Sequence, residues 1–200
     1  MLPSLIVAIF GVLIFLFIFW KRIREDYAPG IIFESAFYIL LGIGISQLVS
    51  LRFFPNWFFW AGFLGSIAGL FAGYLRFKLR LYESLEGLII GLLPWVSFVF
   101  LKDSVINSSL SSFLAFLATL LAIFIFYYID THFREFTWYK SGKVGFTGLS
   151  TLALVFVVRS AIALFGISVL TFAGIYEAFV SGGVAFVCLI LIYVLSKKIE

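Results

Sequence analysis

Charged residues are scarce in this sequence. Only 12% of its 200 residues are Asp, Glu, Lys or Arg, and 64% are hydrophobic. A soluble domain typically has about 25% charged and 45–50% apolar residues. A soluble protein of this size has too little interior to bury so much apolar surface. The surplus therefore predicts a protein that is embedded in a lipid bilayer.

Cysteine and histidine are almost absent, and this excludes several kinds of chemistry. Cys188 is the only cysteine, so the chain cannot form an internal disulfide, and its apolar surroundings favour a buried, unreactive thiol. His132 is the only histidine, and the sequence has no H-E-x-x-H, G-x-S-x-G or phosphate-loop motif. We therefore expect no metal site and no cofactor.

The basic residues form short clusters between apolar runs, so we also expect no nucleic-acid partner.

Apolar runs of about 20 residues, the length that a membrane-spanning helix needs, follow one another along the whole chain. Helices are expected because lipid cannot satisfy backbone N–H and C=O groups. Basic residues follow the first run instead of preceding it, so we expect a retained helix and not a cleaved signal peptide. The prediction is an all-α integral membrane protein, a single transmembrane domain of about seven helices. Its spans are about 3–20, 31–51, 57–75, 84–101, 109–129, 147–166 and 177–195.

Basic residues are concentrated in every second segment between these spans. Those segments hold Lys21, Arg22, Arg24, Arg76, Lys78, Arg80, Arg134, Lys140, Lys143, Lys197 and Lys198, whereas the other loops hold Arg52 and Lys102. Cytoplasmic loops of membrane proteins carry the excess of Lys and Arg. The pattern places the N-terminus outside and the C-terminus inside, in a multi-pass protein of the plasma (inner) membrane.

Small residues recur at helix-packing intervals in the third span. Gly65, Gly69 and Gly73 form two consecutive G-x-x-x-G steps, which allow helix backbones to approach closely in lipid. We therefore expect the third span to be central and the first, which is bulky nearly all round, to be peripheral. The fourth run is slightly short and contains Pro94, which predicts a kink.

One basic residue, Arg159, lies within an apolar run. It is about twelve residues into the sixth span, roughly 18 Å from the inner surface at about 1.5 Å per residue. An ionisable residue at that depth is costly and marks a candidate functional site. Its guanidinium could pair with a carboxylate, for which Glu177 is the candidate, or hold a phosphate. The alternative is a side chain that snorkels to the outer interface.

Four other polar residues lie at a similar depth toward the outer leaflet. Ser46 and Gln47 are late in the second span, Ser66 is near the middle of the third, and Ser97 is in the outer half of the fourth. We expect these four and Arg159 to line one cavity that opens to the outer leaflet. Each is a weak signal alone, because Ser and Gln often bond only to a neighbouring helix.

Several stretches resemble the motifs of a known enzyme family. They are residues 33–48 (F-E-S-A-F-Y-I-L-L-G-I-G-I-S-Q-L), residues 59–74 (F-W-A-G-F-L-G-S-I-A-G-L-F-A-G-Y) and residues 140–165 (K-S-G-K-V-G-F-T-G-L-S-T-L-A-L-V-F-V-V-R-S-A-I-A-L-F). The layout resembles prolipoprotein diacylglyceryl transferase, which has seven helices, an outer N-terminus and an inner C-terminus. The resemblance implies transfer of a diacylglyceryl group from phosphatidylglycerol to the cysteine of a lipoprotein precursor. It also implies that Arg159 holds the lipid phosphate, and that the family's histidine falls on Trp60 or Ala61, of which we expect Trp60 to border the cavity.

The remaining charged residues of the family's motifs are not present in this chain. No arginine occurs in residues 44–47, residues 95–100 contain neither the arginine nor the asparagine of the family signature, and Ala163 stands in place of a glutamate. The catalytic residues are therefore unknown, and two interpretations stay open besides an active transferase. The chain could be an inactive relative that binds anionic lipid or a membrane partner. A small transporter would be expected to show repeated or broken spans, and none is visible.

Overall fold

The computed structural model describes residues 2–136, 145–165 and 176–197, and every regular element in those ranges is helical. Seven helices in them are long and apolar enough to cross a membrane, which confirms the predicted number of spans. They are α1 (Leu2–Ile23), α2 (Pro29–Phe53), α3 (Phe58–Phe77), α4 (Leu81–Asn107), α5 (Leu110–His132), α6 (Phe146–Leu164) and α7 (Tyr176–Lys197), with short 3-10 helices η1 (Pro55–Trp57) and η2 (Phe133–Glu135).

The predicted boundaries differ most from the structure at α4. The sequence suggested a slightly short span over 84–101, whereas α4 has 27 residues and continues through Pro94. Polar residues such as Glu83 and Asp103 occupy its first and last turns, so the helix extends beyond the apolar run on which the prediction was based. A proline removes one backbone donor, but helices packed in a membrane bundle tolerate it.

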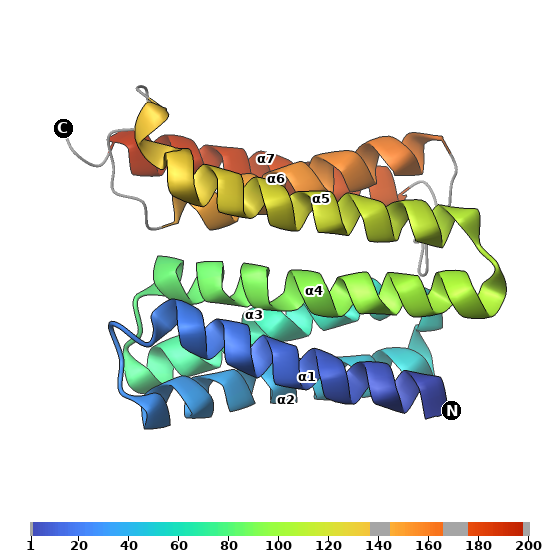
Figure 1. Ribbon diagram of the computed structural model, residues 1–200, viewed down its shortest axis with the longest axis horizontal. Coiled ribbons are helices and arrows are strands. Elements are labelled where there is room, and N and C mark those ends of the chain that lie inside the picture. Colours follow the sequence, from blue (N-terminus) through green and yellow to red (C-terminus); the bar gives the residue numbers. More distant parts are fainter. Residues whose placement is uncertain (1, 137–144, 166–175, 198–200) are drawn as a thin grey trace.

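The helices run side by side in two groups, α1 to α4 and α5 to α7 (Figure 1). Because the number of spans is odd, α1 begins and α7 ends at opposite ends of the bundle (Figure 1). More than half of the apolar stretch of α4 is buried, compared with a third of that of α3. The prediction that the third span is central is therefore wrong, and α4 is the central helix.

The glycines of α3 explain why this helix is not the centre. They all face α2: a Cβ built on Gly69 would lie 2.4 Å from the carbonyl oxygen of Tyr38, and one on Gly65 would lie 2.4 Å from that of Gly42. The prediction that these glycines pack closely against another helix is confirmed. They join α2 and α3 into a tight hairpin. Helix α4, in contrast, contacts α1 within its own group and α5 and α6 in the other group.

Helix α1 is peripheral, as expected, and packs on α4 along one side. Its large side chains Phe15 and Phe19 are fully buried and lie over Gly91 and Gly87 of α4. The opposite side of α4 packs against α5 and α6, for example through Ile89. Both faces of α4 therefore contribute to the core.

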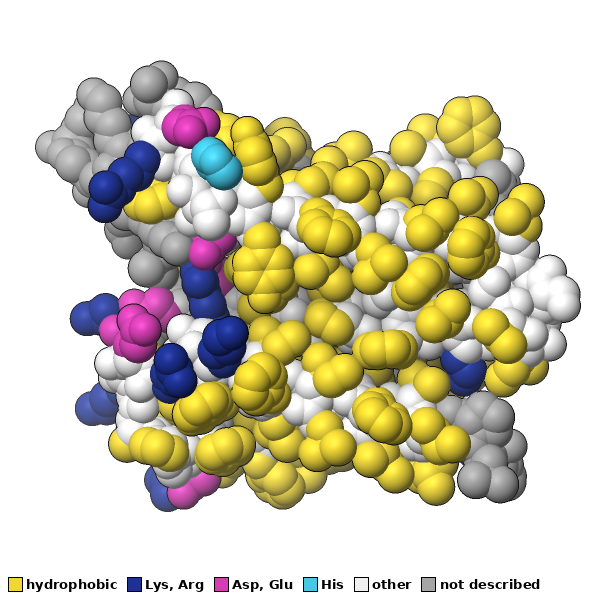
Figure 2. All heavy atoms as spheres, in the orientation of Figure 1, with side chains coloured by type: hydrophobic (Ala, Val, Ile, Leu, Met, Phe, Trp, Pro, Cys, Tyr) yellow, Lys and Arg dark blue, Asp and Glu magenta, His cyan; other side chains and the backbone are white. Residues whose placement is uncertain are grey.

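The face of the bundle seen in Figure 2 is apolar over most of its length. Large side chains such as Leu75 and Phe124 are more than 70% exposed, which would be unfavourable in water and is ordinary in lipid. The Lys and Arg side chains on the visible face gather mainly at one end (Figure 2). Lys140, Lys143 and Lys198 lie outside the described residues. The seven apolar helices suit a multi-pass membrane protein, and the orientation and the plasma-membrane location stay predictions.

Candidate functional site

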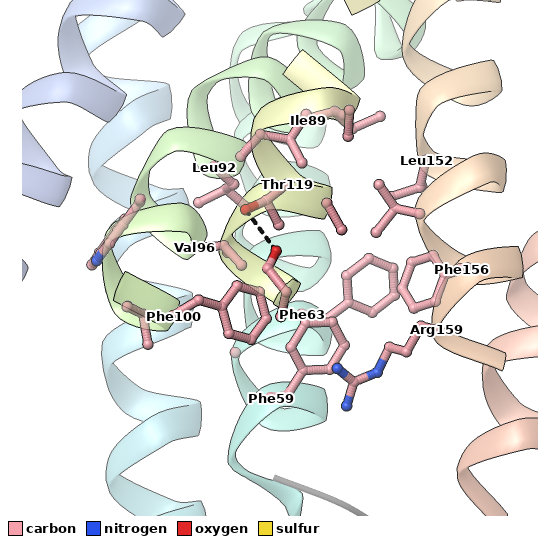
Figure 3. A pocket seen from close by; sticks show the side chains of 18 of the residues that line it. Phe59, Phe63, Ile89, Leu92, Val96, Phe100, Thr119, Leu152, Phe156 and Arg159 are labelled. Atoms are coloured by element: carbon pink, nitrogen blue, oxygen red, sulfur yellow. Dashed lines mark hydrogen bonds between the residues drawn. The ribbon is translucent and has the colours of Figure 1, made fainter. Parts of the chain in front are cut away.

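An apolar cavity of about 460 Å³ lies between the two groups of helices. Its volume falls within the roughly 300–1,000 Å³ that is typical of small-molecule sites. Phe59 and Phe63 from α3 and Phe156 from α6 form an aromatic wall, in which the ring centroids of Phe63 and Phe156 are 5.0 Å apart (Figure 3). The opposite wall comes from α4 and α5 and includes Leu92, Val96, Phe100 and Thr119 (Figure 3).

Arg159 lies at one end of this cavity and points into the bundle (Figure 3). Its side chain is 14% exposed, and its Nε donates a hydrogen bond to Oε1 of Glu177. The guanidinium carbon lies 3.8 Å from the centroid of the Phe59 ring, in cation–π geometry. The prediction that Arg159 faces the interior is confirmed, and the alternative of a snorkelling side chain is wrong.

Glu177, in the first turn of α7, is 1% exposed and accepts hydrogen bonds from three donors. Besides Arg159, these are the indole Nε1 of Trp60 at 2.9 Å and the hydroxyl of Ser181 at 2.9 Å. A carboxylate in the first turn of a helix also interacts favourably with the helix dipole. The carboxylate therefore connects α3, α6 and α7 at the end of the cavity.

The ion pair between Arg159 and Glu177 is retained inside the bundle at a cost in desolvation. Two charges removed from water are stable only when they pair well and their remaining polar atoms are satisfied. The three donors to Glu177 and the Phe59 ring beneath Arg159 meet that requirement. The result is a fixed, charged end on a cavity whose other lining residues, among those that the structure describes, are uncharged.

Two of the polar residues predicted for the cavity line it together with Arg159. Gln47 of α2 and Ser66 of α3 both border the space. The hydroxyl of Ser66 donates to the carbonyl of Phe63 at 2.7 Å, so it is already satisfied by its own helix. Gln47 is partly exposed and adds an amide, which can both donate and accept a hydrogen bond.

The three other residues predicted for the cavity lie outside it. Ser46 donates to the carbonyl of Ile43 at 3.0 Å and faces Gly65, so it belongs to the contact between α2 and α3. Ser97 is buried on α4 but does not line the cavity. Trp60, which we expected to border the cavity, turns instead toward Glu177 and is 3% exposed.

The aromatic wall was not recognised from the sequence. The chain has 27 Phe residues, so the residue type alone does not single out Phe59, Phe63 and Phe156. Their spacing offers a weak signal, since residues 59 and 63 are four apart on α3 and residues 156 and 159 are three apart on α6. Only the packing of α3 against α6 brings the two pairs together.

Comparisons of the chain with protein-family models, with curated proteins and with solved structures give no match. Within the described residues, no group of three His, Cys, Asp or Glu side chains could hold a metal ion. The interpretation of the site therefore depends on its own geometry, an apolar cavity bordered at one end by the ion pair of Arg159 and Glu177.

Proposed function

We propose that this protein binds a membrane phospholipid, with an acyl chain in the Phe-lined cavity and the phosphate at Arg159. The observation that carries the proposal is the position of the Arg159 guanidinium, paired with Glu177, at one end of a cavity whose other described lining residues are uncharged. Such a site is complementary to a ligand that is apolar along its length and charged at one end. In a bilayer, phospholipids are the abundant ligands of that kind.

The depth of the ion pair supports this proposal. Arg159 is five residues before the end of α6, or roughly 8 Å at about 1.5 Å per residue, and Glu177 is the second residue of α7. Both charges therefore lie close to one end of the helices, whereas the cavity extends toward the middle. A lipid placed in this way has its phosphate at the end of the cavity that is nearer to the end of α6 and the start of α3, and its chain among apolar side chains.

Transfer of a diacylglyceryl group, which the family resemblance implies, is the second candidate. In that reaction the cysteine sulfur of a lipoprotein precursor bonds to the glycerol carbon of phosphatidylglycerol, the carbon–oxygen bond to phosphate breaks, and glycerol phosphate leaves. The thiol proton must pass to a base, and Glu177 is the carboxylate beside Arg159. Three donors already occupy that carboxylate, an arrangement typical of an anchoring residue, so the geometry favours binding over transfer.

The proposal predicts that Arg159→Gln lowers the amount of phospholipid retained by the purified protein. Arg159→Lys should restore only part of it, because an ammonium lacks the planar donor fork of a guanidinium. Arg52→Gln is the matched control, since Arg52 is an exposed arginine in the last turn of α2 and does not line the cavity. Lipid bound per protein is counted by native mass spectrometry after equilibration with phosphatidylglycerol.

Because Arg159→Gln leaves Glu177 without its cation, the double variant Arg159→Gln/Glu177→Gln serves as a second, charge-balanced test. Unchanged lipid retention in a folded Arg159→Gln or double variant would contradict the phosphate role. A separate assay with labelled phosphatidylglycerol and a cysteine-containing lipoprotein peptide distinguishes transfer from binding. A labelled peptide product would establish the second candidate, and retention of lipid without product would support binding alone.

A further inference from the structure

The charged end of the cavity has no net charge. Arg159 and Glu177 both border the space, and every other described residue that lines it is uncharged. A phosphate that approaches the guanidinium therefore also approaches a carboxylate. This differs from a phosphate site made by arginine alone, where an anion meets only positive charge.

We propose that Glu177 makes the site select a zwitterionic phospholipid, one with a phosphate and an amine, over a lipid with a net negative head group. In this arrangement the phosphate contacts Arg159 and the amine contacts Glu177. The inference rests on the proposed function, because it assigns the head-group class of the same lipid. It also differs from the phosphatidylglycerol that the family resemblance implies.

The carboxylate cannot avoid an incoming anion by turning away. Glu177 is held by the Trp60 indole and the Ser181 hydroxyl, and it is 1% exposed. Like charges repel more strongly in a medium of low polarity than in water. An anionic head group therefore binds at a cost that a lone arginine would not impose, and its lipid loses affinity relative to a neutral one.

A head group with an amine removes that cost. A carboxylate can accept at about four lone-pair positions, and Glu177 accepts from three donors in the structure. An ammonium group supplies a further hydrogen-bond donor to Glu177. It also supplies a positive charge that balances the negative charge of the bound phosphate. Because only a short carbon linker joins the amine to the phosphate of such a lipid, the two groups can reach adjacent partners, and Arg159 and Glu177 are in direct contact.

The test is a competition between phosphatidylethanolamine and phosphatidylglycerol with identical acyl chains. The protein is equilibrated with equal amounts of both lipids, and the ratio of the two bound forms is measured by native mass spectrometry. We expect the unmodified protein to favour phosphatidylethanolamine and Glu177→Gln to shift the ratio several-fold toward phosphatidylglycerol. Glu34→Gln is the control, because it removes an equal charge from an exposed position on α2 that does not line the cavity.

The outcomes separate this inference from the proposed function. Preference for phosphatidylglycerol in the unmodified protein, or an unchanged ratio in Glu177→Gln, would overturn the head-group assignment while leaving lipid binding intact. Failure to bind either lipid, or binding that Arg159→Gln does not weaken, would overturn the proposed function itself. If Glu177→Gln does not fold, Arg159→Gln/Glu177→Gln replaces it; this variant should show no preference, and a persisting preference would also overturn the inference.

Discussion

Glu86 is a second buried carboxylate, at the end of the bundle away from Arg159. It is 2% exposed and accepts a hydrogen bond from Nη2 of Arg22 at 2.6 Å. Its other oxygen accepts from the backbone N–H groups of Gly145 at 3.0 Å and Gly148 at 3.4 Å, at the start of α6. These amides are among the donors that a helix N-terminus leaves without an intrahelical partner. One side chain of α4 therefore satisfies groups on α1 and α6.

We predict that Glu86→Ala lowers the free energy of unfolding by about 1–3 kcal/mol, because it leaves two buried helix-terminal amides without their acceptor and removes one of the two carboxylates that pair with Arg22. Glu83→Ala is the matched control on the same helix. Glu83 pairs with Arg80, whose side chain is 74% exposed, and accepts a hydrogen bond from the Tyr27 hydroxyl, so its removal breaks a solvent-screened pair and leaves no helix-terminal amide without an acceptor. The free energies of unfolding of both variants are measured by titration with SDS in mixed micelles. Unfolding is detected by maleimide labelling of Cys188, which is buried in the folded protein. Equal losses in the two variants would contradict the assigned role of Glu86.

Small residues join pairs of helices in two different ways. Between α2 and α3, Gly65 and Gly69 bring backbone against backbone. Between α1 and α4, Gly87 and Gly91 instead make room for the rings of Phe19 and Phe15. Lipid is as apolar as these side chains, so close packing has to replace the hydrophobic effect as the source of association. Each contact requires a glycine, because a side chain at that position would occupy the space that the neighbouring helix fills.

We predict that Gly69→Ala destabilises the protein by about 1–3 kcal/mol, the usual cost of overpacking. The added Cβ would lie 2.4 Å from the carbonyl oxygen of Tyr38 and 2.6 Å from Cα of Ile39, and backbone atoms cannot move aside as the tip of a side chain can. Gly69→Leu should be worse. Gly44→Ala on α2 is the control, because nothing lies within 4 Å of its added Cβ. The same SDS titration measures both variants, and a loss in Gly44→Ala as large as that in Gly69→Ala would refute the explanation by packing.

At the scale of the whole molecule, the sequence predicts the number of spans and their positions but not their neighbours. Hydropathy gives the length of each apolar run. The central position of α4 depends instead on which helix faces pack against one another, and hydropathy does not contain that information. Arg159 and Glu177 are 18 residues apart on consecutive antiparallel helices, so their place at the same end could be expected. Their direct contact depends on the length and direction of the Arg159 side chain, which spacing alone does not provide.

The distribution of basic residues predicts the orientation of the whole bundle in the membrane. The basic residues gathered at one end, including Arg22, Arg76 and Arg80, should face the cytoplasm. A phosphatase reporter that is active only outside the cytoplasm should therefore be inactive when fused to the C-terminus. The same reporter inserted after Asn107, between α4 and α5, should be active, because four spans precede it. An active C-terminal fusion with an inactive one at Asn107 would reverse the orientation and move the Arg159 end of the cavity to the cytoplasmic leaflet.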